Sequence, residues 1–296
     1  MSPALEALRE AGRVASAARD IGARRIVAGA LVRDVCQEVE DEIHRRGAHP
    51  AFPAQSSRNE TAAHYCPSPE DETAYEDGDL AKLDVGVHVD GYVVDTALTV
   101  NVGDRPGNRR AVEAARSALD AAIAQVRVGV EVGRLSAVIE STIRSLGLRP
   151  MRNLCGHGVG RWTVHCPPPI PNSPDGSGDR LGAGSVVAIE PFATAGQGLV
   201  VERGEAEVFR FDPQRPDDPE VDKEMMAAIR AFRGLPFARR QLSGFPRLRV
   251  EEALAGLRKR RALMAYAPLV EAGGNGVAQA EHTIFVGDLG VEVLTR

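Results

Sequence analysis

The sequence predicts an α+β protein made of two similar halves, one of which carries a helical insertion. Residues 29–50 and 129–150 resemble each other at an offset of 100 positions. Each segment begins with glycine, continues as an amphipathic helix and ends at a second glycine followed by proline. The strand-like stretches around Asp84 and Glu190 also correspond, with a carboxylate at the same strand position. A helix and a strand that recur together indicate an internal duplication.

The insertion follows the second of these strands. Residues 212–265 begin with a polar, proline-rich stretch and continue with two helical patterns. After them the chain returns to a β-branched, strand-like pattern that ends at Arg296. We therefore expect residues 1–296 to form a single domain, with 212–265 as a helical insertion subdomain within it.

The composition excludes several classes of protein. With 296 residues, 43% of them hydrophobic and 26% charged, the chain is long enough for one large core. The net charge of −5 gives no electrostatic attraction to nucleic acid or to an anionic membrane. The first 22 residues form a charged amphipathic helix, not a signal peptide, and no apolar run could span a bilayer. The four cysteines lack paired spacing, so we expect a cytoplasmic protein with reduced thiols. No sequence feature indicates an oligomer, and a monomer is the default expectation.

Residues 83–100 predict a β-hairpin in which two aspartates interrupt an apolar pattern. The turn is Asp90-Gly91, the residue pair that a type I′ turn favours. Alternation then places Asp84 and Asp95 on the same face as diagonal neighbours, about 7–8 Å apart. Two carboxylates this close resist joint ionisation unless a positive charge lies between them. A metal ion is the economical explanation; the alternative is a solvated outer face of the hairpin.

Three further residues favour the metal. Glu190 and Glu281 lie in strongly apolar strand patterns, where an unpaired carboxylate costs several kcal/mol, and His157 lies in a glycine-rich stretch. Each of these acids alone is more often structural. Together with the two aspartates they form an oxygen-rich set that suits two divalent ions about 3.5–4 Å apart. One imidazole and no thiolate favour Mn, Fe or Co, and Zn is also compatible.

Five stretches carry a resemblance to a known family. They are FPAQSSRNETAAHYCP (52–67), LDVGVHVDGYVVDTA (83–97), NLCGHGVGRWTVHCPPPIPN (153–172), VVAIEPFATAG (186–196) and AQAEHTIFV (278–286). In this order they resemble the type II methionine aminopeptidases, in particular the archaeal ones. The resemblance implies the pita-bread fold, a pseudo-twofold pair of α/β halves around a central antiparallel sheet. The helical insertion is what distinguishes type II from type I in that family.

The resemblance also implies an activity and a set of site residues. The activity is hydrolysis of the N-terminal methionine from nascent proteins and peptides with a small second residue, with the ribosome as a candidate partner. Glu190 would move the proton, His64 would lie beside the scissile bond, and His165 would steady the tetrahedral intermediate. The implied metal ligands are Asp84, Asp95, His157, Glu190 and Glu281, with Asp95 and Glu281 shared between two ions. The implied methionine pocket contains Phe52, His64, His165, Phe192 and Tyr266.

Two alternatives remain at this stage. One is an Xaa-Pro aminopeptidase or prolidase of the same fold, although those enzymes usually carry a substantial N-terminal domain and here the first repeat begins near Gly29. The other is a non-catalytic pita-bread binding protein, although loss of catalysis appears as substituted ligands and all five are present. We expect no catalytic role for His44, His49, His88 or His282.

Overall fold

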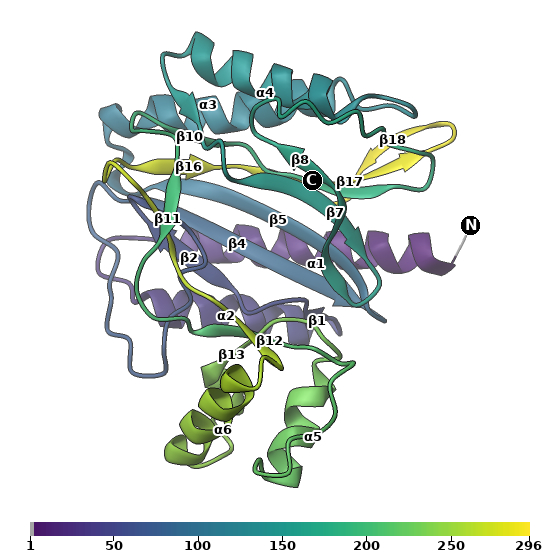
Figure 1. Cartoon of the computed structure of the whole chain (residues 1–296). Helices are drawn as coiled ribbons and strands as arrows, with labels where there is room; N and C mark the ends of the chain where they lie inside the picture. Colours follow the sequence, from purple (N-terminus) through teal and green to yellow (C-terminus); the bar gives the residue numbers. More distant parts are fainter. Residues whose placement is uncertain (1–2) are drawn as a thin grey trace.

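The computed structural model describes residues 3–296 and is organised around an antiparallel sheet of nine strands (Figure 1). Seven strands follow one another in the order β1-β4-β5-β17-β9-β7-β8, while β2 pairs with β4 and β18 pairs with β17. The strands of this sheet are β1 (His49–Pro50), β2 (Gln55–Arg58), β4 (Leu80–Val89), β5 (Tyr92–Asn101), β7 (Cys155–Gly160), β8 (Thr163–Pro171), β9 (Val186–Ile189), β17 (Glu281–Gly287) and β18 (Gly290–Val293).

Four helices pack against this sheet in two pairs (Figure 1). They are α1 (Pro3–Arg25), α2 (Val32–Arg45), α3 (Pro106–Ile123) and α4 (Val132–Ser145), and the short 3₁₀ helix η1 (Val102–Asp104) follows β5. Helices α1 and α2 share a hydrophobic cluster with β4, and α3 and α4 share one with β9 and β17. The amphipathic helix predicted at the N-terminus is α1; the first two residues of that prediction lie outside the described residues.

The predicted repeat appears in the structure as α2 and α4. Both helices have 14 residues and lie 100 positions apart. Gly47 and Gly147 follow them with φ of 80° and 71°, the left-handed backbone that ends many helices. Each glycine leads into a two-residue strand, β1 in the first half and β6 (Arg149–Pro150) in the second. This confirms that the two halves begin with the same structural unit.

The predicted hairpin is formed by β4 and β5. Asp90 and Gly91 have φ of 51° and 84°, as a type I′ turn requires, and Gly86 pairs with Asp95. Leu83, Val85 and Val87 pack on α1 and α2. Because side chains alternate along a strand, the aspartates point to the sheet face away from these helices.

The sheet brings together segments that are far apart in the sequence. Strand β17 pairs with β5 on one side and with β9 on the other. Strand β9 also pairs with β7, where Ala188 lies opposite His157. The strands that carry or adjoin the five predicted ligands are therefore neighbours in one sheet.

Smaller sheets complete the structure. One contains β10 (Phe192–Thr194), β16 (Val277–Gln279) and β6, and another contains β3 (Thr61–Ala63), β11 (Val200–Glu202) and β15 (Leu269–Glu271). Within residues 3–296 no helix has the length and apolarity needed to cross a lipid bilayer.

The two predicted helices of the insertion are α5 (Lys223–Ala231) and α6 (Arg247–Lys259), at the lower end of Figure 1. The stretch also contains strand β13 (Phe237–Ala238) and the 3₁₀ helix η2 (Arg239–Leu242), which the sequence patterns did not indicate. Strand β13 joins β12 (Val208–Phe211) and β14 (Leu263–Tyr266) in a third small sheet. These elements enclose a hydrophobic cluster of their own.

A buried ion pair connects this insertion to α2. The guanidinium of Arg240 in η2 lies 2.5 Å from the carboxylate of Glu40, and both side chains are at most 10% exposed. Glu40 also accepts a hydrogen bond from the backbone N–H of Ala54, at 2.9 Å. Burial raises the pKa of Glu40, whereas the charge of Arg240 lowers it. Arg240 therefore compensates a carboxylate that would otherwise be buried alone.

We predict that Arg240→Met lowers the free energy of unfolding by about 3–5 kcal/mol, because it leaves the Glu40 carboxylate buried without its cation. Urea denaturation measures this change. The control is Arg249→Met, which removes an exposed ion pair with Asp222 (3.6 Å; side chains 64% and 40% exposed) and should cost less than about 1 kcal/mol. Equal losses in the two variants would contradict the prediction.

Candidate metal centre

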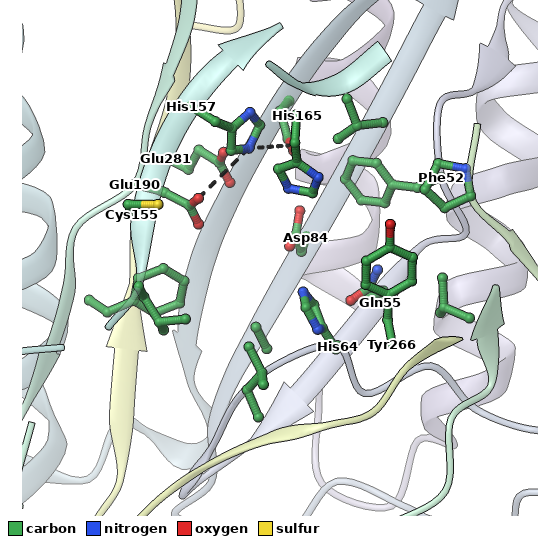
Figure 2. Close-up of a pocket in the computed structure, with 18 of the residues that line it drawn as sticks. Phe52, Gln55, His64, Asp84, Cys155, His157, His165, Glu190, Tyr266 and Glu281 are labelled. Carbon is green, nitrogen blue, oxygen red and sulfur yellow. Dashed lines mark ion pairs between the residues drawn. The ribbon is translucent and has the colours of Figure 1, made fainter. Parts of the chain in front are cut away.

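The five predicted ligands line one cavity of about 220 Å³ on the sheet face away from the helices (Figure 2). Asp84 projects from β4, Asp95 from β5 and His157 from β7. Glu190 directly follows β9, and Glu281 is the first residue of β17. The structure therefore brings together side chains that are up to 197 positions apart in the sequence.

Three of these residues already have the geometry of a metal site. Asp95, His157 and Glu281 each offer a ligand atom, and these atoms all lie within 4.8 Å of one another. The Nε2 atom of His157 is 3.7 Å from a carboxylate oxygen of Asp95 and 3.7 Å from one of Glu190. Asp84 borders the same cavity.

Three of the carboxylate oxygens lack a hydrogen-bond partner in the described part of the chain. Oδ1 of Asp84, Oδ1 of Asp95 and Oε1 of Glu281 are buried and have no hydrogen-bond partner among residues 3–296. A buried anionic oxygen without a partner is strongly unfavourable, and such atoms in native proteins usually indicate a ligand or an ion. Oxygen donors with one imidazole are a donor set for divalent cations, so these residues fit a metal.

Burial and mutual repulsion shift the pKa values of the acids upward. Burial raises the pKa of Asp84 to about 7. Burial raises the pKa of Asp95, Glu190 and Glu281 well above the usual range, and the negative charges of neighbouring acids raise it further. Without a cation the cluster therefore holds protons near neutral pH.

The imidazole of His157 is neutral in this site. Burial, and then the neighbouring His165, lower the pKa of His157 to about 3. Its Nδ1 lies 3.1 Å from the carbonyl oxygen of Gly158, which orients the ring. The neutral form is the one that binds metals.

Groups behind the ligands fix their positions. The hydroxyl of Thr283 accepts a hydrogen bond from the N–H of Asp95 (2.7 Å) and donates one to the Asp95 carbonyl (2.8 Å). The side-chain nitrogen of Gln279 lies 3.4 Å from carboxylate oxygens of both Glu190 and Glu281. The sequence patterns did not indicate either group. Thr283 lies two residues after Glu281 on the same face of β17, and this alternation is the signal that could have found it. Gln279 ends the preceding strand, β16.

His64 and His165 face the same cavity (Figure 2). His64 has φ of 66°, an unusual backbone conformation for a residue with a side chain and one that clusters at functional sites. Burial lowers its pKa. The side chain of His165 is partly open to solvent. Desolvation by the surrounding protein, and then the charges of His64 and Arg210, lower its pKa to about 4. Both rings are neutral near pH 7 and can exchange hydrogen bonds with a substrate.

An apolar wall adjoins the metal ligands. The predicted pocket residues Phe52, Phe192 and Tyr266 all line the cavity, and the ring of Tyr266 lies edge-on to His64 at 5.7 Å. The other residues that line the cavity were not predicted from the sequence, because they lie outside the five matching stretches or at positions in them to which the resemblance gives no role. These are Gln55, Ala63, Asn153, Leu154, Cys155, Val164, Val208, Pro236 and Leu269.

The remaining histidines lie outside this cavity. His44, His49 and His88 contact one another in a row, with ring centroids 5.6 Å and 5.5 Å apart. The ring of His282 pairs with the hydroxyl of Thr295 at 2.9 Å. None of these four borders the cavity.

Comparison with known proteins identifies the family. The family described as metallopeptidase family M24 matches residues 6–288. The chain belongs to this family. This M24 chain is 41% identical to the methionine aminopeptidase of Archaeoglobus fulgidus, over 98% of each protein.

Solved structures agree with this assignment. The M24 chain is 26% identical to the methionine aminopeptidase of Thermotoga maritima, with a TM-score of 0.73 over 100% of this chain and 98% of that one. It also resembles the prolidase of Pyrococcus furiosus, with a TM-score of 0.64 over 100% of this chain and 64% of the other. At 18% identity the second likeness shows the fold alone. The predicted pita-bread fold and family resemblance are confirmed, and the chain is a metallopeptidase whose donor cluster fits divalent metal ions.

We predict that the metal-free M24 chain loses stability as the pH rises from about 4 to about 7. The folded pKa of Asp84 lies above its unfolded value, so in this range the folded state holds a proton that the unfolded state releases. Below about pH 4 Asp84 is protonated in both the folded and the unfolded state, so its ionisation no longer makes stability depend on pH. Urea denaturation with excess chelator measures the fall.

Saturating Mn²⁺ should reduce this fall, because the ion binds the deprotonated carboxylates of the folded state. The variant Asp95→Asn should show a shallower fall than the wild type without metal, since it removes one of the repelling acids. A metal-free wild type whose stability rises through the same pH range would refute the prediction.

Proposed function

We propose that this chain is a methionine aminopeptidase that removes the N-terminal methionine from nascent proteins and peptides with a small second residue. The observation that carries the proposal is a buried set of metal donors that shares one cavity with two neutral histidines and an apolar wall. The names of the relatives support it, since the Archaeoglobus protein is similar over nearly its whole length. We further propose a cytoplasmic monomer, with the ribosome as a candidate partner.

The proposal includes two divalent ions, Co, Mn, Fe or Zn. Asp84, Asp95, His157, Glu190 and Glu281 would hold them, with Asp95 and Glu281 shared. When bound, such ions polarise the substrate carbonyl and lower the pKa of water toward 7. The unpartnered oxygens of Asp84, Asp95 and Glu281 support this assignment.

The other residues bind the substrate and move protons. Glu190 accepts the proton of the attacking water and transfers it to the leaving amine, a role that its position at the cavity edge allows. His64 and His165 hydrogen-bond the substrate carbonyl and the oxyanion that develops from it. Phe52, Phe192 and Tyr266 form the apolar wall against which the methionine side chain packs.

The insertion has a place in this proposal. We propose that residues 1–296 form one catalytic domain and that 212–265 is an insertion within it. Pro236 lies inside the insertion, and Val208 and Tyr266 lie just outside its two ends; all three line the cavity. The insertion would therefore close the methionine side of the pocket.

Peptide hydrolysis tests the proposed function. With Mn²⁺ supplied, the chain should release methionine from Met-Ala-Ser, should act slowly on Met-Leu-Ser because of its bulky second residue, and should not cleave an Ala-Pro peptide. Release of alanine from the Ala-Pro peptide would favour a prolidase-type activity, for which the shared fold is a precedent. No release from any peptide would favour a binding protein.

We predict that His64→Ala lowers kcat for Met-Ala-Ser by about 100-fold or more, because a hydrogen bond to the developing oxyanion is lost. The metal content should stay near that of the wild type, since His64 is not among the proposed ligands. Steady-state kinetics and elemental analysis measure the two effects. Loss of metal together with activity would reassign His64 to the metal centre.

A further inference from the structure

Gln55 lines the cavity that the metal donors and the apolar wall share (Figure 2). Strand β2 pairs with β4 so that Gln55 lies directly opposite Asp84. Residues that face each other across an antiparallel pair project on the same side, with Cβ atoms about 4.5–5.5 Å apart. The side chain of Gln55 therefore enters the cavity beside the Asp84 carboxylate.

The amide of Gln55 is buried but not satisfied. Gln55 is 6% exposed, and its Oε1 atom has no hydrogen-bond partner among residues 3–296. A buried amide oxygen without a donor is unfavourable, and its persistence in a cavity wall indicates that a ligand supplies the donor.

An amide that lies behind the cavity wall, bonded to the backbone of lining residues, shows what a purely structural role looks like. Asn172 is fully buried, and its side-chain nitrogen donates to the carbonyl oxygens of Leu154 (3.1 Å) and Glu190 (3.2 Å). Its oxygen accepts the N–H of Phe192 at 2.8 Å. Asn172 is thus paired by the protein on both sides, whereas the oxygen of Gln55 is left for something that enters the cavity.

The chemistry of the proposed substrate restricts what this donor can be. The thioether and the carbonyl of an N-terminal methionine accept hydrogen bonds but do not donate them. The N–H bonds of an N-terminal methionine belong to its α-amino group. An acceptor such as Oε1 therefore selects the amino group.

We propose that Oε1 of Gln55 accepts a hydrogen bond from the free α-amino group of the substrate, so that Gln55 helps to select peptides with an unblocked N-terminus. This inference rests on the proposed function, because it assumes a methionine residue in the cavity. Gln55 then acts as a substrate-binding residue beside the metal donors, on the side where Phe52 and Tyr266 hold the methionine side chain.

Calorimetry with two ligands tests this role. L-methionine and 4-(methylthio)butanoic acid differ only in the amino group, and each is titrated into Mn²⁺-loaded protein. Gln55→Met keeps the length of the side chain and removes the amide. It should weaken L-methionine binding by about 10-fold and leave binding of the desamino ligand unchanged. Gln55→Leu should give the same pattern, and thermal denaturation shows that each variant is folded.

Gln37→Met is the matched control, since it makes the same chemical change on an exposed face of α2 and should alter neither affinity. Equal weakening of both ligands by the Gln55 variants, or no weakening of either, would overturn the inference while wild-type cleavage of Met-Ala-Ser still upholds the proposed function. A wild-type chain that binds neither ligand and cleaves no methionyl peptide would overturn both.

Discussion

Desolvation and mutual repulsion of four clustered carboxylates govern the centre of this protein. Asp84, Asp95, Glu190 and Glu281 share one cavity, and three of them present an oxygen that has no hydrogen-bond partner among residues 3–296. Such a cluster can persist in only two ways, by binding protons or by binding cations. The raised pKa values correspond to the protonated state without metal. Membership of a metallopeptidase family points to the state with bound cations. The rest of the fold serves to hold these acids in place against their repulsion.

The antiparallel sheet supplies that rigidity, and small residues give it room. A side chain at Gly86 would place its Cβ 2.2 Å from the ring of Phe52, and one at Gly156 would lie 2.3 Å from the carbonyl oxygen of Ala188. Neither contact is tolerable. Glycine at these positions lets an aromatic wall and neighbouring strands approach the metal donors closely. The helices on the other face add the buried apolar area that keeps the strands in register.

Local patterns in the sequence were enough to predict much of this arrangement. The Asp90-Gly91 turn determines the register of its hairpin, and the register determines that Asp84 and Asp95 share a face. The offset of 100 positions revealed α2 and α4 for a similar reason, because helix periodicity and glycine stops are local signals. The proposed metal donors were inferred from the hairpin and the acids in apolar strands, and then from the family resemblance. His64 and His165 were inferred from the resemblance alone, and the cavity contains all seven residues.

The features that could not be predicted from the sequence depend on contacts between residues far apart in the chain. The hydrogen bonds of Thr283 with Asp95 join residues 188 positions apart, and no periodicity encodes them. The place of Gln55 beside Asp84 follows from the pairing of β2 with β4, which its polar segment did not indicate. Pro236 lines the cavity from within the insertion, which the ion pair between Arg240 and Glu40 connects to α2. Such tertiary placements need the structure.

Crystals of the chain grown with Zn²⁺, with data collected at the zinc absorption edge, show whether these side chains bind metal together. We expect anomalous density within about 2.0–2.2 Å of ligand atoms of Asp95, His157 and Glu281. We also expect Asp84 and Glu190 to contact the same ion or a second one beside it. Crystals in which zinc occupies other sites while this cavity contains none, with the five side chains turned apart, would contradict the account.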